Sequence, residues 1–487
     1  MLRILLLLPL FGAVVVALLP ARNFALLRHT ALAATCLVGV FAWSLLGQFD
    51  PTQAAIQLYE THAWHERLGS SFSLGVDGFS FPLVLLATLL MPVAVVASSG
   101  VTKGAKLYFS LLLLLETAVL GVFMARDWSL FYVFWELTLI PLFFLIDRLG
   151  GQNRQRRQKA ALNFVLYTMG GSVFMLIALL LLYDAVPTHS FDMSAIAAAA
   201  RGLPLATQVW IFAGLFIGFG VKMAVFPMHG WAPLVYAEAP SAVPLISSGI
   251  LLKMGGYGLL RAIETLPGAA WSLHGWLAVL AFVTLLHGGI LAWRQRDLIV
   301  MLAYASVSHM GVVLLGLATL NPAGLTGAVM QMVAHGLVAG VLFLLVGLLH
   351  ARTRTRDIGD YSSLVRTMPR FAFFMVLALT ATVGLPGTAG FIAELHAMVG
   401  GFQRWGGWMV LLSLSLLIGA AYALRTAGRL FTGPVGDKMR AVADLDRNEM
   451  AAAGVLSLAI LAVGFHPAPA LALVGASVDR LARFFGG

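Results

Sequence analysis

Seven ionisable residues interrupt the apolar stretches of this 487-residue chain. Each stands near the middle of a run that is otherwise almost free of charge, as in LLLLLETAVLG and FIGFGVKMAVFP. A charged side chain at the centre of a bilayer costs about 2.5–3.5 kcal/mol on insertion scales. A structural ion pair, or a side chain reaching for the interface, would explain one such residue but not a set spread along the chain. The set consists of Glu116, Glu136, Lys222, Lys253, His309, His335 and Glu394.

These residue types suit proton transfer better than the binding of another ion. An apolar site disfavours the charged form of lysine, which makes its proton easier to exchange, and histidine titrates near neutrality. A carboxylate such as Glu136 would stabilise a nearby lysine in its charged form, and moving or protonating that carboxylate would release the proton. A sodium site would instead need clustered carboxylates, hydroxyls and carbonyls, and buried lysines would repel the cation. The sequence therefore predicts a buried proton path.

The composition indicates a membrane protein without redox chemistry of its own. Soluble domains carry about a quarter charged residues, whereas this chain is 11% charged and 60% hydrophobic. The single cysteine, Cys36, excludes an internal disulfide and a multi-cysteine metal or iron–sulfur site. We find no glycine-rich dinucleotide loop, P-loop or nucleophile–base set, and the histidines are too scattered for a metal site. We expect no cofactor or metal in this chain.

Apolar runs long enough to cross a bilayer follow one another along the sequence. A crossing helix needs about 20 apolar residues, and lipid offers no water to pair the backbone, so helices rather than strands are expected. The N-terminal run is expected to stay as the first span rather than to be removed as a signal peptide. The sequence predicts an all-α polytopic protein with about 14 spans. They lie near residues 2–20, 30–47, 80–99, 107–124, 129–147, 161–183, 207–226, 243–263, 271–293, 298–319, 323–349, 370–399, 404–424 and 449–466.

The distribution of lysine and arginine predicts the orientation. The net charge is +10, and most of the basic residues fall in one alternating set of loops, such as the cluster at 154–159. Basic loops stay in the cytoplasm of bacterial inner-membrane proteins. That set is therefore expected to be cytoplasmic, and both termini periplasmic. The excess charge fits this bias better than nucleic-acid binding.

Two predicted spans carry helix breakers in their middle. The seventh contains AVFPMHGWAP, with Pro227 and His229, and the twelfth contains VGLPGTAGFIAEL, with Pro386 and Gly387. Broken helices are tolerated at that depth where they line a buried or watery cavity, and paired breaks are typical of inverted repeats. We therefore predict two inverted five-helix halves with discontinuous helices 7 and 12. The predicted segments are 1–106 (helices 1–3), 107–265 (helices 4–8), 266–427 (helices 9–13) and 428–487 (helix 14 and the tail).

Several motifs give the chain a family resemblance from about residue 70 to about residue 430. They include GVDGFSFPLVLL, FYVFWELTLIPLFFL, GILLKMGGYGLLR, AYASVSHMG, AHGLVAGVLFLLVGLLHARTRTRDI and GLPGTAGFIAEL, in family order and spacing. The chain resembles the antiporter-like M subunits of bacterial NADH:quinone oxidoreductase, respiratory complex I. The resemblance implies 14 helices, inverted five-helix bundles and no cofactor in the chain. Flavin, iron–sulfur clusters and NADH would belong to partner subunits, quinone would bind elsewhere, and further antiporter-like subunits would be neighbours in the membrane.

The resemblance also implies roles for the buried residues. The family's functional glutamates match Glu116, Glu136 and Glu394, its lysines Lys222 and Lys253, and its histidines His309 and His335. We expect protons to be taken up from the cytoplasm near span 7, to reach Lys222, to pass along Lys253 and the histidines, and to leave by Glu394. The Glu136–Lys222 pair would act as the switch.

The sequence departs from the family where APLVYAEAP replaces the usual LPDAHxEAP, and where Ile299 and Val300 replace a basic pair. A divergent paralogue is therefore an alternative to a standard complex I copy. Two other functions stay open. One is the sister role in a cation/proton antiporter or membrane-bound hydrogenase complex, and the other is a structural subunit whose channel has been lost.

Overall fold

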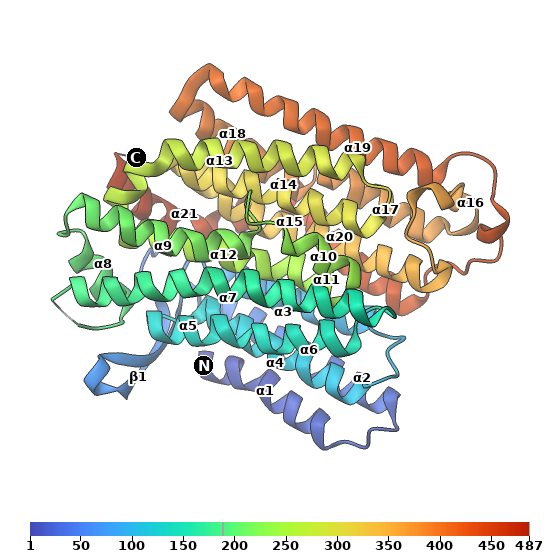
Figure 1. Cartoon of the computed structure of the whole chain (residues 1–487), viewed down its shortest axis with the longest axis horizontal. Helices are drawn as coiled ribbons and strands as arrows, with labels where there is room; N and C mark the ends of the chain where they lie inside the picture. The colour runs from blue at the N-terminus through green and yellow to red at the C-terminus, as the bar shows by residue number, and fades with distance from the viewer. Residues whose placement is uncertain (188, 487) are drawn as a thin grey trace.

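The computed structural model describes residues 1–187 and 189–486, and it is a bundle of helices that run roughly parallel to one another (Figure 1). In chain order the helices and strands are α1 (Leu2–Leu18), α2 (Phe24–Ser44), β1 (Gln57–His65), β2 (Ser70–Val76), α3 (Phe81–Ala97), α4 (Ala105–Met124), α5 (Trp128–Leu137), α6 (Leu139–Leu149), α7 (Arg154–Ala185), α8 (Met193–Ala200), α9 (Leu205–Met223), α10 (Trp231–Glu238), α11 (Ala242–Ile246), α12 (Leu252–Thr265), α13 (Pro267–Arg294), α14 (Leu298–Thr319), α15 (Pro322–Thr353), α16 (Leu364–Thr367), α17 (Pro369–Thr382), α18 (Ala389–Trp405), α19 (Ser413–Phe431), α20 (Arg447–Phe465) and α21 (Ala468–Ala482).

The helix lengths confirm a polytopic all-α membrane fold. Within the described residues, 10 helices are long and apolar enough to cross a bilayer, or 11 if the bent pair α18–α19 is one span. Three shorter apolar helices, α1, α3 and α17, occupy further predicted spans. The predicted count of 14 requires all of these to cross, and it stays a prediction, as does the division into inverted halves.

Both predicted helix breaks are present. α9 ends at Met223, Ala224 adopts a left-handed conformation, and a turn that contains Pro227 and His229 leads into α10. Between α17 and α18 the chain passes through Pro386 and then Gly387, whose φ of 93° favours glycine. Proline removes a backbone donor, and glycine permits the left-handed turn, so neither helix continues through these residues.

Four local features were not predicted. β1 and β2 form a short antiparallel hairpin. The hairpin was missed because its sequence is too polar and too short to indicate a membrane span. The span near residues 129–147 is split into α5 and α6 at Thr138. A π turn over Ser247–Leu251 joins α11 to α12. The tail, for which no helix was predicted, forms α21, whose apolar face is buried at Val474 and Val478.

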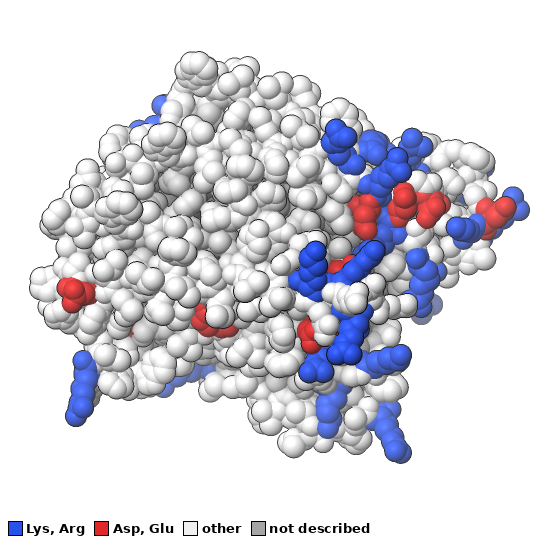
Figure 2. Space-filling model, viewed as in Figure 1, with Lys and Arg blue, Asp and Glu red and all other residues white. Residues whose placement is uncertain are grey.

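The two ends of the bundle differ in charge. Lysine and arginine side chains gather at one end (Figure 2), over the loops that follow α1, α3, α6, α15 and α19. We call this the basic end. The opposite end, called the outer end below, carries few of them in this view, and both chain termini lie toward it (Figure 1).

The centre of the bundle consists of the segment α11–α12 and the long helix α15. The apolar window of Ala242–Thr265 is entirely buried, and that of α15 is 89% buried. By contrast α7 and α13 are each 39% buried over their windows, so they form the flanks of the bundle. Lys253 and Arg261 on α12 and His335 on α15 are therefore buried inside the bundle.

Candidate functional site

Lys222 lies near the C-terminal end of α9, next to the break of that helix. Its side chain is buried, and Nζ donates a hydrogen bond to the Thr138 hydroxyl over 2.9 Å. Nζ also lies 5.3 Å from the ring centroid of Trp135 and 5.9 Å from that of Phe164. The ammonium group therefore has one neutral oxygen and two aromatic faces as neighbours, and aromatic faces attract cations.

Glu136 does not form the predicted ion pair with Lys222. It is half-buried, its Oε1 has no hydrogen-bond partner among the described residues, and it lines an open groove of about 550 Å³. Exposed apolar side chains such as Val133 and Ile140 form the same groove. The reason is local: the split between α5 and α6 presents the Thr138 hydroxyl to the lysine, while Glu136 reaches the flank of the bundle.

Lys253 lies at the start of α12 and is fully buried. Its Nζ donates a hydrogen bond to the Ser248 carbonyl, which belongs to the π turn that precedes α12, and lies 2.6 Å from His335 Nδ1. A π turn interrupts the regular α-helical hydrogen bonds and often marks a functional site. Here it supplies a backbone acceptor to a fully buried lysine.

The two histidines and Glu394 continue this contact from Lys253. The rings of His335 and His309 have centroids 5.1 Å apart. His309 Nδ1 lies 3.2 Å from Gln331 Nε2 and 3.6 Å from Glu394 Oε1. Four of the predicted residues therefore form one buried row, which we call the central row: Lys253, His335, His309 and Glu394.

The break before α18 makes room for the last residue of this row. Gly384 has a φ of 70°, and a Cβ atom built there would lie 2.5 Å from Glu394 Oε2. Any larger residue would therefore collide with the carboxylate. The predicted helix breakers Pro386 and Gly387 belong to the same turn, so the break positions Glu394 as well as interrupting the helix.

Three predicted residues lie apart from the central row. Glu116 on α4 is buried, and neither of its carboxylate oxygens has a hydrogen-bond partner within the described part of the chain. His229 packs against the His287 ring, with centroids 5.0 Å apart. No hydrogen bond or ion pair between described residues joins Lys222 to Lys253. The continuous line of charges that the sequence predicted is therefore two separate groups in this structure.

Two cavities approach the central row from the basic end. A small cavity of about 10 Å³, close to the room that one water needs, is lined by Ser306, His309 and His335. A larger cavity of about 350 Å³ is lined by Glu238, His350 and basic residues that follow α15. Phe343 lines both cavities, so its side chain is a wall that the two cavities share.

Several neighbours of the buried ionisable groups were not singled out from the sequence. They are Thr138 beside Lys222, and Ser248, Gln331 and Phe343 beside the central row. Threonine, serine and glutamine are common in membrane helices, where their side chains often bond the backbone of the same helix. Only packing shows which of them meet an ionisable group. For Thr138, its place two residues after Glu136 was the one available signal.

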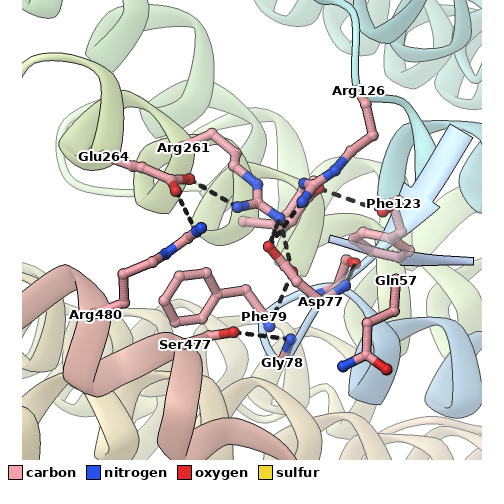
Figure 3. A network of polar contacts seen from close by, with 12 residues as sticks. Gln57, Asp77, Gly78, Phe79, Phe123, Arg126, Arg261, Glu264, Ser477 and Arg480 are labelled. Atoms are coloured by element: carbon pink, nitrogen blue, oxygen red, sulfur yellow. Dashed lines mark hydrogen bonds and ion pairs between the residues drawn. The ribbon is translucent and has the colours of Figure 1, made fainter. Parts of the chain in front are cut away.

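A second charged cluster, also missed, lies at the outer end (Figure 3). Asp77 accepts hydrogen bonds from Arg126 at 2.9 Å and from Arg261 at 2.7 Å, and all three residues are buried. Arg261 also bonds Glu264, which in turn accepts from Arg480 of α21. Burial alone would raise the pKa of Asp77, but the charges and hydrogen bonds of Arg261 and Arg126 hold it well below its usual range.

Known proteins share both the sequence and this arrangement. Residues 125–419 match the family described as "NADH:quinone oxidoreductase/Mrp antiporter, TM". A protein of Thermosynechococcus vestitus, named NAD(P)H-quinone oxidoreductase chain 4 2, is 37% identical over 498 residues, which cover 100% of this chain and 92% of the relative.

The chain belongs to this family. Another member, NADH-quinone oxidoreductase subunit M of Rhodobacter capsulatus, is 36% identical over 468 residues, which cover 94% of this chain and 90% of that protein. A chain in the structure of respiratory complex I from Thermus thermophilus with bound NADH is 30% identical, with a TM-score of 0.92 and 100% of both chains covered. A chain of the Mrp complex from Dietzia sp. is 21% identical with a TM-score of 0.89, and it shows that the fold is shared.

Proposed function

We propose that this chain is the proton-translocating membrane subunit of a bacterial NADH:quinone oxidoreductase, respiratory complex I. The observation that carries the proposal is the central row, in which a buried lysine contacts a histidine and a second histidine contacts a buried glutamate. Groups of these types exchange protons, and ionisable residues inside a membrane mark proton relays. The family membership supplies the redox complex that would drive the transfer.

The charge asymmetry supports one direction of transfer. The basic end is cytoplasmic by the positive-inside bias, which makes both termini periplasmic. The cavity at the basic end then takes up protons from the cytoplasm beside the end of α10, whereas the sequence predicted uptake near span 7. Its inner wall at Phe343 adjoins the small cavity beside His309 and His335, so protons reach the central row directly and leave past Glu394.

Lys222 and Glu136 form the proposed switch rather than the first step of this route. Lys222 donates a hydrogen bond to the neutral Thr138 hydroxyl. Whether the lysine keeps its proton therefore depends on the electric field of nearby charges. Glu136 changes that field through space, because charges interact over several ångströms at the low effective dielectric of a protein. Redox chemistry, with flavin, iron–sulfur clusters, NADH and quinone, is assigned to partner subunits, which include further antiporter-like subunits in the membrane.

The decisive experiment compares proton pumping by complexes with and without a functional row. Vesicles that contain the purified intact complex are energised with NADH, and internal acidification is followed with a pH-sensitive dye. Glu394→Gln keeps the shape of the side chain and removes its titratable group, so acidification should fall about tenfold or more while the complex stays assembled. Asp437→Asn, on an exposed aspartate, is the matched control. Normal pumping by an assembled Glu394→Gln complex would refute the proposal.

A sister role in a cation/proton antiporter complex is the second candidate, because the family description names both complexes. Purification with partner proteins separates the two. Flavin-containing and iron–sulfur partners favour the oxidoreductase, whereas partners without redox groups, together with sodium-dependent pH changes in vesicles, favour the antiporter.

A further inference from the structure

The charged cluster at the outer end shares a helix with the central row. Lys253, Tyr257 and Arg261 lie four residues apart on α12, so their side chains follow one face of the helix. Eight residues of α-helix span about 12 Å. Arg261 therefore stands about two turns from the lysine that begins the central row, on the side of the outer end.

Tyr257 fills the space between these two cations. It is fully buried, its hydroxyl donates to the Phe123 carbonyl over 3.3 Å, and the Arg261 guanidinium carbon lies 4.9 Å from its ring centroid. The hydroxyl proton of Tyr257 is therefore directed at the backbone carbonyl of Phe123 and not toward Lys253 or Arg261.

A small cavity reaches Arg261 from the outer side. It measures about 40 Å³, enough for a few waters at most, and it is lined by Arg126, Trp128, Arg261, Glu264 and Arg480, among others. Three buried N–H groups on the lining residues have no hydrogen-bond partner within the described part of the chain. They are Arg126 Nε, Trp128 Nε1 and Arg261 Nε.

These unpartnered groups have a chemistry in common: all three are donors. Arginine keeps its proton at any pH that a protein meets, and the tryptophan N–H cannot accept one. A water bonded to such groups turns its oxygen toward them and its hydrogens away. That orientation interrupts a hydrogen-bonded wire along which a proton could move, and fixed arginine charges repel protons in other selective pores.

We propose that Arg126 and Arg261, held by Asp77, form a proton barrier that separates the central row from water at the outer end. This rests on the proposed function, because a barrier has a purpose only if Lys253 carries protons. Asp77 accepts hydrogen bonds from both arginines and offsets part of their charge, whereas the guanidiniums stay protonated with or without it. Its oxygens are occupied by both arginines and by the backbone N–H groups of Phe79 and Ser80.

The same contacts also tie α12 to the segment before α3, and α12 to α21 (Figure 3), so a purely structural role must be distinguished. A barrier depends on the positive charge of the arginines, whereas a structural tie depends on the ion pairs. Arg261→Gln removes the charge and the pairs, Arg261→Lys keeps the charge, and Asp77→Asn keeps both arginine charges but breaks the pairs.

The test measures passive proton leak through the assembled complex. Vesicles that contain the complex and an internal pH dye receive a pH jump without NADH. Arg261→Gln should raise the leak rate about fivefold or more, since a fixed charge that excludes protons is lost. Arg261→Lys and Asp77→Asn should leak nearly as slowly as the wild type. Adding Lys253→Met to Arg261→Gln should return the leak to the wild-type rate, because the path then lacks its inner carrier.

Two results would overturn the barrier. The first is a leak through Asp77→Asn as fast as that through Arg261→Gln, which would show that packing, and not the arginine charge, blocks protons. The second is an assembled Arg261→Gln complex that does not leak. If Arg261→Gln fails to assemble, Arg126→Gln takes its place with the same expectation. A failure of the proposed function has a different signature, namely normal NADH-driven pumping by Lys253→Met alone.

Discussion

The surroundings of Lys222 and Lys253 differ, although the two lysines look alike in the sequence. Lys222 has a threonine hydroxyl and aromatic rings as neighbours, and the carboxylate expected to pair with it lies on the flank of the bundle. Lys253 contacts a histidine, and through it a second histidine and a glutamate.

The difference indicates separate tasks for the two lysines. A side chain such as Lys222, whose hydrogen-bond partner within the described residues is a hydroxyl, can hold or lose a charge, but it has no titratable hydrogen-bond partner to receive the proton. A side chain in contact with titratable groups can pass its proton on. Lys222 is therefore suited to sensing charge, and Lys253 to carrying protons.

The largest effect is expected where the carrier itself is removed. Lys253→Met keeps most of the side-chain volume but removes the ammonium group, and we expect NADH-driven acidification to fall at least about tenfold, the scale of losing a positioned proton carrier. Dye quenching in vesicles measures the rate, and gel filtration checks assembly. Equal losses in Lys253→Met and Lys222→Met would erase the distinction between the two sites.

A smaller effect is expected from moving the far end of the central row. Gly384→Ala places a methyl group 2.5 Å from the initial position of Glu394 Oε2, at a backbone conformation that alanine rarely adopts. A strain on the order of 1 kcal/mol corresponds to about a fivefold slower transfer. Gly428→Ala is the control, because a Cβ there meets no atom within 4 Å. If the two variants pumped equally well, Glu394 would not need its present position.

The Lys222 site should be less sensitive to a single change. Thr138→Val removes the hydroxyl that accepts the lysine's hydrogen bond and keeps the shape, and we expect pumping to fall about threefold, since a hydroxyl supports but does not carry the proton. Thr88→Val, at a buried threonine that bonds only its own helix, should be silent. A loss as large as that of Lys253→Met would make Thr138 part of the conducting path.

The smallest effect is expected from a side chain beside the row. Gln331 Nε2 contacts His309 but has no titratable proton, so Gln331→Leu should slow pumping only about twofold, by loosening the ring. Measuring the pumping rate against pH tests this role, because a positioning residue should shift the profile of His309 rather than abolish it. A complete loss would show that Gln331 or a water bound to it conducts.

The broad architecture could be predicted because lipid imposes strict rules on a sequence. Long apolar runs mark the helices, basic loops mark one end of the bundle, and the breaks at Pro227 and Gly387 follow from proline and glycine chemistry. The β hairpin, the π turn before Lys253 and the packed helix α21 gave no comparable signal, because their formation depends on neighbours that are distant in the chain.

The sequence by itself identified most of the ionisable residues that interrupt apolar runs and are buried, namely Glu116, Lys222, Lys253, His335 and Glu394. Only the tertiary structure decided which of them touch. Helix packing brings Lys253, His335, His309 and Glu394 into one row and directs Glu136 away from Lys222. The same packing buries Arg126 and Arg261, which the sequence analysis did not single out, beside the Asp77 carboxylate that both of them bond.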